Sequence, residues 1–193
     1  MEKRIFECGC IVGILYFVAV GVFLVTKTDV ALTIWEVLTI LGAVQELIIL
    51  LEICHQFSVS VVCRNIMIAF MSCTCALTGV AHFVNMTVTR PLIQKGVDVP
   101  TYFQIGCWPS VEMAIDFLAW GFFAGFAFLS VSLGIARVNQ LTTTIKKWLF
   151  VCGVLCLTGF TGTVFVNDLI WYVAPMGYGA GIVMICFRMR KGV

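Results

Sequence analysis

The chain has 193 residues, of which 61% are hydrophobic and 11% charged, and its formal net charge is +2. An average soluble domain carries about 25% charged residues, so the polar surface available here is too small for a soluble globular protein. The same apolar composition excludes an intrinsically disordered chain. The near balance of charges excludes nucleic acid as a partner, because phosphate contacts need a basic patch or stripe. The lipid bilayer is therefore the expected surrounding.

Six apolar stretches are long enough to cross that bilayer, whose hydrocarbon core of about 30 Å needs about 20 apolar residues in a helix. The sequence therefore predicts an all-α fold, a polytopic transmembrane helix bundle that forms a single domain over residues 1–193. An outer loop is expected at 89–108. A break at Asn167 and Asp168 is expected to separate the last two spans, and the alternative is a single re-entrant pair. The predicted spans are 9–25, 31–53, 65–88, 109–136, 148–166 and 168–187.

The Lys and Arg residues of the loops predict the orientation, because cytoplasmic loops carry an excess of positive charge. With the N-terminus in the cytoplasm, nine of these residues lie on the cytoplasmic side and three, Lys27, Arg90 and Lys95, lie opposite. We therefore expect both termini in the cytoplasm (N-in, C-in) and the cell membrane as the location. An odd number of spans would move the basic cluster at 188–191 outside, so the charge pattern also favours six.

Polar side chains recur at helical spacing inside the predicted spans, where one charged group costs roughly 2.5–3.5 kcal/mol. In the third span, five polar residues spaced by three and four share one helix face. They are Cys75, Thr78, His82, Asn85 and Thr89. Three other spans carry similar sets. These are Glu36, Thr39 and Glu46 in the second span, Glu112, Asp116 and Trp120 in the fourth, and Asp168, Tyr172, Pro175 and Tyr178 in the sixth.

The predicted topology places most of these groups in the outer half of the membrane. Four helices with polar residues at one depth predict a shared polar cavity that opens outward below the 89–108 loop. No Cys and His residues have the spacing of a zinc site, and no cofactor-binding motif is present, so we expect neither a metal nor a cofactor. The residues expected to bind a ligand are His82, Asn85, Glu112, Asp116, Trp120, Glu36, Asp168 and Tyr172.

Each of these residues also has a structural interpretation. Glu36 and Asp168 lie within two turns of a predicted helix start, where a carboxylate interacts favourably with the helix dipole. Glu112 follows a Trp-Pro-Ser run that is typical of a helix N-terminus at the membrane surface. His82 would in this interpretation form a hydrogen bond across a helix contact, and Asp116 lies deeper than the other carboxylates of the fourth span.

The run from Trp108 to Gly121, Trp-Pro-Ser-Val-Glu-Met-Ala-Ile-Asp-Phe-Leu-Ala-Trp-Gly, resembles the fourth helix of an uncharacterised family of small six-helix bacterial membrane proteins. The preceding His82-Phe-Val-Asn85 run is similar too. The resemblance implies no established activity. It implies that Glu112, Asp116, His82 and Asn85 are the positions to test first.

Three functions fit these observations, and no familiar hydrolase, metalloprotease, P-loop or dinucleotide motif decides among them. The first is binding, or help in transporting, a small organic molecule or cation in the outward-facing cavity. The second is an intramembrane acid/base enzyme of the isomerase or cyclase type, acting on a lipid-soluble substrate through Asp116, Glu112 and His82. The third is a structural accessory subunit whose polar residues only join helices. The predicted partners are the lipid bilayer and a small-molecule ligand.

Overall fold

The computed structural model describes residues 2–192, with the side chains of Glu2 and Asp168 outside the described set. Within that range the chain forms helices and turns and no strand. Six segments are long and apolar enough to cross a membrane, which confirms the predicted all-α bundle of six spans. The spans are α1 (Glu2–Thr26), α2 (Asp29–Gln56), α3 (Val61–Val84) with η1 (Asn85–Thr89) and α4 (Arg90–Gln94), α5 (Val111–Phe117) with η3 (Leu118–Phe123) and α6 (Ala124–Gly134), α7 (Gln140–Phe165), and η4 (Asp168–Val173) with η5 (Met176–Gly181) and α8 (Ile182–Gly192).

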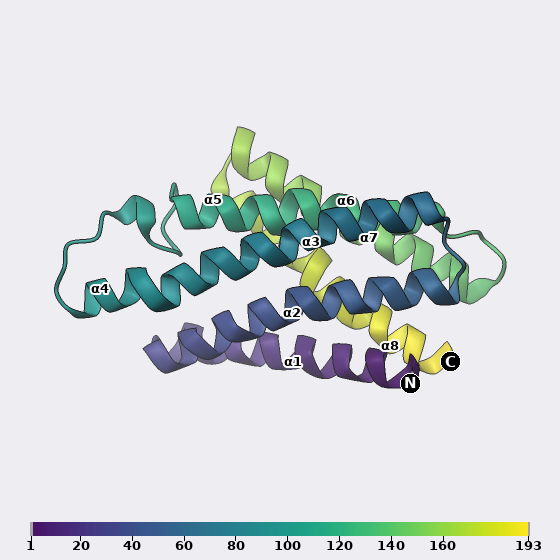
Figure 1. The fold of residues 1–193 in the computed structure, drawn as a ribbon, viewed down its shortest axis with the longest axis horizontal. Coiled ribbons are helices and arrows are strands. Elements are labelled where there is room, and N and C mark those ends of the chain that lie inside the picture. The colour runs from purple at the N-terminus through teal and green to yellow at the C-terminus, as the bar shows by residue number, and fades with distance from the viewer. Residues whose placement is uncertain (1, 193) are drawn as a thin grey trace.

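The helices lie along one long axis, and α1 begins at the same end of the bundle at which α8 ends (Figure 1). The opposite end carries the short turn between α1 and α2 and the segment between α4 and α5, which contains a single 3-10 turn, η2 (Thr101–Phe103). We call this opposite end the loop end. Glu36 lies seven residues into α2, and therefore about 10 Å from the start of that helix at the loop end.

Several helix boundaries differ from the prediction, and the structure shows a local cause for two of them. α7 begins at Gln140 rather than at 148, because Asn139 and Thr142 form a reciprocal capping box: the Thr142 amide donates to Asn139 Oδ1 at 2.8 Å, and the Asn139 amide donates to Thr142 Oγ1 at 3.0 Å. The third span continues to Gln94, so the outer loop starts later than 89. Pro91 does not end this span: α4 follows the π-helical turn η1 without a break, and such a local change of helix type is one way in which membrane helices accommodate proline.

The predicted break between the fifth and sixth spans is present. α7 ends at Phe165, and Asn167 caps the next element by accepting a hydrogen bond from the Leu169 amide at 2.8 Å. The chain therefore crosses the bundle separately as α7 and as η4–η5–α8. This arrangement brings η5, with Tyr178, into the interior of the bundle.

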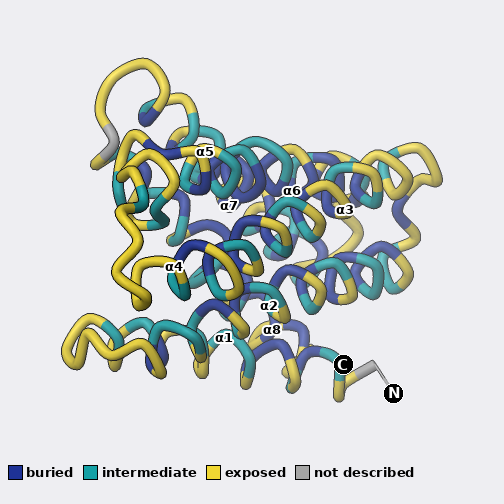
Figure 2. Tube along the Cα trace, turned by 60° about the vertical axis from the view of Figure 1, so that its left-hand side comes forward, coloured by how far each residue is buried: buried dark blue, intermediate teal, exposed yellow. Residues whose placement is uncertain are grey.

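Along the chain trace, buried positions lie mainly where helices face one another, and exposed positions lie mainly on the outside of the bundle and in the loops (Figure 2). Large apolar residues such as Ile11, Val18 and Leu133 are among the exposed ones. Such an apolar outer surface suits hydrocarbon. α6 and α7 approach closely at Gly153, where an added Cβ would lie 2.8 Å from the carbonyl oxygen of Gly125. Small residues at a helix contact permit this close approach in membranes.

Candidate functional site

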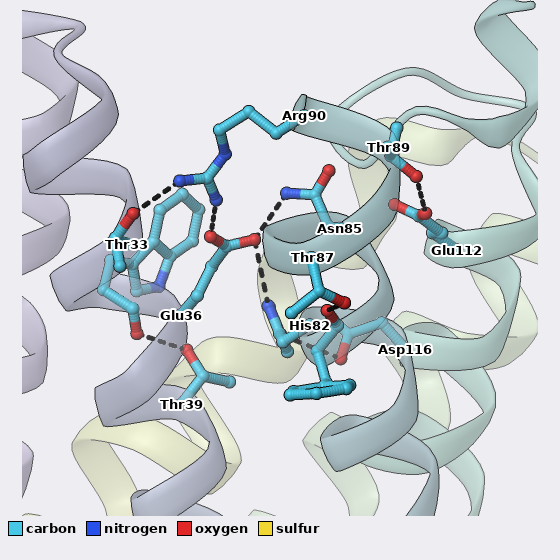
Figure 3. A network of polar contacts seen from close by, with 12 residues as sticks. Thr33, Glu36, Thr39, His82, Asn85, Thr87, Thr89, Arg90, Glu112 and Asp116 are labelled. Atoms are coloured by element: carbon cyan, nitrogen blue, oxygen red, sulfur yellow. Dashed lines mark hydrogen bonds and ion pairs between the residues drawn. The ribbon is translucent and has the colours of Figure 1, made fainter. Parts of the chain in front are cut away.

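A network of buried polar side chains joins α2, the α3–η1–α4 segment and α5 near the loop end (Figure 3). Its central residue is Glu36 on α2, which is 1% exposed. Asn85 Nδ2 donates a hydrogen bond to Glu36 Oε1 at 2.5 Å, and the Arg90 guanidinium forms an ion pair with Glu36 Oε2. Arg90 Nη1 also donates to Thr33 Oγ1 at 2.5 Å. We call this set the outer network. Its members are Thr33, Glu36, His82, Asn85, Thr89, Arg90, Glu112 and Asp116.

His82 lies between two carboxylates that come from different helices. Its Nδ1 is 3.8 Å from Glu36 Oε1, and its Nε2 is 3.6 Å from Asp116 Oδ1. Both distances exceed hydrogen-bonding length, and neither ring nitrogen has a hydrogen-bond partner within the described residues. His82 as a whole residue is 4% exposed. His82 therefore connects α2 with α5 electrostatically while both of its nitrogens stay free to bond.

Glu112 and Asp116 supply carboxylate oxygens that the described residues do not satisfy. Thr89 Oγ1 donates to Glu112 Oε1 at 2.7 Å, but Glu112 Oε2 and Asp116 Oδ1 have no hydrogen-bond donor within the described part of the chain. Glu112 is 5% exposed, and the Asp116 side chain is 15% exposed. The network thus combines three carboxyl groups with one guanidinium and one imidazole, which leaves it rich in hydrogen-bond acceptors.

Local structure explains how these side chains reach one place. The predicted polar face of the third span is buried at Thr78, His82, Asn85 and Thr89. Its last residues form the π-helical turn η1, in which the Arg90 amide donates to the Asn85 carbonyl oxygen, so Arg90 follows Asn85 on the same side of the helix. π-helical turns inside helices often occur at functional sites.

The fourth span is positioned by a side-chain cap. Ser110 Oγ accepts a hydrogen bond from the Met113 amide at 3.1 Å and begins α5 there. Glu112 therefore lies in the first helical turn, where the helix dipole favours a carboxylate, and Asp116 follows one turn later. Glu112 therefore has both roles: it lies at the helix N-terminus, as the structural interpretation expects, and it is a member of the outer network.

Arg90 is the residue that the sequence prediction missed. It falls in the predicted outer loop, which is expected to begin at 89. In the structure it lies on α4 and is the counter-ion of Glu36. The usable signal was electrostatic: a buried carboxylate such as Glu36 needs a cation, and Arg90 has the same predicted depth.

Three other predicted site residues lie elsewhere or cannot be placed. Trp120 is buried one turn beyond Asp116, where its ring stacks on Tyr178 with 4.4 Å between centroids. Tyr172 is 70% exposed and lies apart from the outer network. The side chain of Asp168 lies outside the described residues. The sixth span does not present the single predicted face, because the 3-10 turn η4 and the π turn η5 replace the 3.6-residue period.

A groove at the loop end borders the network. It has a volume of about 360 Å³ and is lined by Asp29, Met86 and Gln94 together with two network residues, Thr33 and Arg90. The other network residues do not line this groove. Arg90 therefore contacts both the groove and the buried Glu36, and lies between the surface and the acidic groups beneath it (Figure 3).

This arrangement suits the binding of an organic cation or of a hydrogen-bond donor. Among the side chains that the structure describes, no group of three His, Cys, Asp or Glu residues is placed to hold a metal ion. The free carboxylate oxygens can accept hydrogen bonds, and His82 lies between two carboxylates whose nearest oxygens are 3.8 and 3.6 Å from its ring nitrogens. In comparisons with known proteins, no family model, curated protein or solved structure matches this chain.

Proposed function

We propose that this integral membrane protein binds a small organic cation at the outer network and helps to transport it. One observation carries the proposal: the network holds three carboxyl groups against one guanidinium and one imidazole, and two of its carboxylate oxygens have no donor within the described residues. Unpaired acceptors in a membrane interior are costly. An ammonium group would supply both the missing positive charge and the missing donors.

The groove at the loop end supports a route of entry. Arg90 lines it and at the same time neutralises Glu36. A positively charged ligand can take over this role, because it offers Glu36 the same charge, and Arg90 can then move its long side chain towards water. Glu112 and Asp116, one turn apart on α5, would bind the ammonium group below.

The same proposal assigns the loop end to the side away from the cytoplasm and both termini to the cytoplasmic side. Of the twelve Lys and Arg residues, only Lys27, Arg90 and Lys95 belong to the loop end. Positive residues are concentrated in cytoplasmic loops. The groove and the outer network would then face the outside, as a receptor site for an external molecule requires.

A thermal-unfolding screen of the purified protein in lipid nanodiscs tests the proposal. Small organic cations and uncharged analogues of similar size are compared, and a bound cation at one hundred times its Kd should stabilise the protein by about 2.7 kcal/mol. Asp116→Asn keeps the shape of the side chain and removes its charge, so it should abolish this stabilisation. Asp98→Asn changes an exposed acid in the loop and should leave it unchanged. A panel in which no cation stabilises the wild type, or in which both variants respond like the wild type, contradicts the proposal.

An intramembrane acid/base enzyme is the second candidate, and the position of His82 between Glu36 and Asp116 favours it. A general base with a carboxylic acid close by is the arrangement that proton transfer needs. Its substrate would be soluble in lipid and would enter between helices. Turnover that persists in the double variant Asp116→Asn/His82→Ala eliminates this mechanism. Loss of stability without any change in binding or turnover in the same variant would instead indicate a purely structural network.

A further inference from the structure

A second polar region surrounds Glu46, deeper in the bundle than the outer network. A cavity there is lined by residues of α1, α2, η3, η5 and α8. The volume within which the centre of a water-sized sphere can move is about 40 Å³. Since one water needs roughly 10–15 Å³ of such space, the cavity holds about three groups of that size.

The carboxyl group of Glu46 lines this cavity and lacks a hydrogen-bond partner for one of its oxygens among the residues that the structure describes. Glu46 is 7% exposed, and its Oε2 has no hydrogen-bond donor within the described residues. None of the lining residues is Lys or Arg. A buried polar atom normally has a partner, and a molecule in the cavity is in a position to supply the donor for Glu46 Oε2.

The cavity wall adds aromatic rings and a hydroxyl group to this carboxyl. Trp120 and Tyr178, stacked on each other, line it together with Tyr16. Thr39 donates its hydroxyl hydrogen to the Trp35 carbonyl oxygen at 2.9 Å, which leaves its lone pairs able to accept a hydrogen bond. Aromatic rings beside a carboxyl group are the surroundings that attract ammonium ions.

Two residues of the cavity lie close to the outer network along their helices. Thr39 follows Glu36 by three residues on α2, and Trp120 follows Asp116 by four, so each of these two lies about one helical turn from a network residue. Glu46 lies ten residues, or about 15 Å, beyond Glu36 along the helix axis. A cation released by the outer network would meet this cavity next.

We infer that the cavity beside Glu46 is a second cation site, for ammonium ions of up to about three non-hydrogen atoms, such as ammonium and methylammonium. The Glu46 carboxylate neutralises the charge and accepts an N–H hydrogen bond, Thr39 accepts a second, and the rings contact the methyl group. The cavity volume sets the upper size limit. This inference rests on the proposed function and names the class of its substrate.

Equilibrium binding of radiolabelled methylammonium to the protein in nanodiscs tests the site. Glu46→Gln keeps the side-chain shape and removes the charge, and it should weaken binding about tenfold or more. Gly42→Ala is a steric test: Gly42 lines the cavity, and a Cβ added there meets no atom within 4 Å, so the methyl group fills space without a clash. It should weaken binding about tenfold as well.

Two variants serve as matched controls. Gly79→Ala on α3 also adds a Cβ with no atom within 4 Å, but Gly79 is not a cavity residue. Glu52→Gln removes a carboxylate from the same helix as Glu46, closer to its far end. Both should bind methylammonium like the wild type, and circular dichroism of all four variants should show the native helix content.

The outcomes separate this inference from the proposed function. Unchanged affinity in both Glu46→Gln and Gly42→Ala overturns the second site, and tetramethylammonium competing as well as methylammonium overturns the size limit. Failure of methylammonium to bind the wild type overturns the whole inference. A larger cation whose binding depends on Asp116 would, in that case, still support the outer site.

Discussion

The ion pair between Glu36 and Arg90 gives a prediction in which the two single variants behave differently. Glu36 is 1% exposed, and Arg90→Gln leaves it with Asn85 and the more distant His82. Removing one partner of a buried ion pair costs about 3–5 kcal/mol. We expect Arg90→Gln to lower the free energy of unfolding by about 3 kcal/mol. This value is at the low end of that range, because His82 Nδ1 remains 3.8 Å from the carboxylate.

Glu36→Gln should cost less, about 1–2 kcal/mol. Arg90 keeps its hydrogen bonds to Thr33 Oγ1 at 2.5 Å and to the Asp29 carbonyl oxygen at 3.3 Å, and it also lines the groove at the loop end. Its guanidinium can therefore turn towards water. The double variant removes both charges, so its cost should fall short of the sum of the single costs by about 2 kcal/mol.

Reversible unfolding by SDS in mixed micelles, followed by circular dichroism, measures all three variants against the wild type. The reasoning is refuted if the effects of the two substitutions simply add, because then the buried charges do not interact. It is equally refuted if Glu36→Gln proves more damaging than Arg90→Gln, because then Arg90, rather than Glu36, is the charge that cannot reach water.

Two further predictions concern the network and the topology. Thr89→Val removes the hydrogen-bond donor of the buried Glu112 and should lower the free energy of unfolding by about 1–3 kcal/mol in the same assay. Thr87→Val is the control, because it changes an exposed hydroxyl that is bonded to its own helix, and it should cost under about 0.5 kcal/mol. Equal costs would show that Glu112 does not depend on Thr89. A membrane-impermeant maleimide applied to intact cells should label Cys107 at the loop end, and Cys107→Ser should abolish this labelling. Labelling of the variant should return when the membrane is permeabilised, because Cys8 then becomes accessible. Labelling that persists in intact Cys107→Ser cells would contradict the proposed orientation.

The number of spans could be predicted because the bilayer imposes a minimum length on each apolar helix. The polar faces of the second and third spans could be predicted for a related reason. Glu36, Thr39 and Glu46 lie on a regular α-helix and are all buried. Where the backbone keeps 3.6 residues per turn, spacing in the sequence translates directly into a shared face.

The same reasoning failed where the backbone leaves that period. Tyr172 and Tyr178 are predicted on one polar face, yet the first is exposed and the second buried. Six residues already separate them by about 120° on an ideal helix, and a 3-10 turn and a π turn along their span change this angle further. Arg90 is not among the predicted site residues, because it falls in the outer loop predicted at 89–108. Its pairing with Glu36 depends on contacts between distant segments, which spacing alone does not encode. The cavity beside Glu46 likewise depends on how five elements pack.

Nitrogen NMR of the protein labelled at histidine, recorded in lipid bilayers, tests the outer network as a binding site most directly. The chain has two histidines, of which His82 lies in the network and His55 is exposed near the other end of α2, where it serves as an internal reference. Addition of a stabilising cation should shift both ring nitrogens of His82 and leave those of His55 in place. Bound cation that shifts neither histidine, or His55 alone, would contradict a site built around His82 and its two carboxylates.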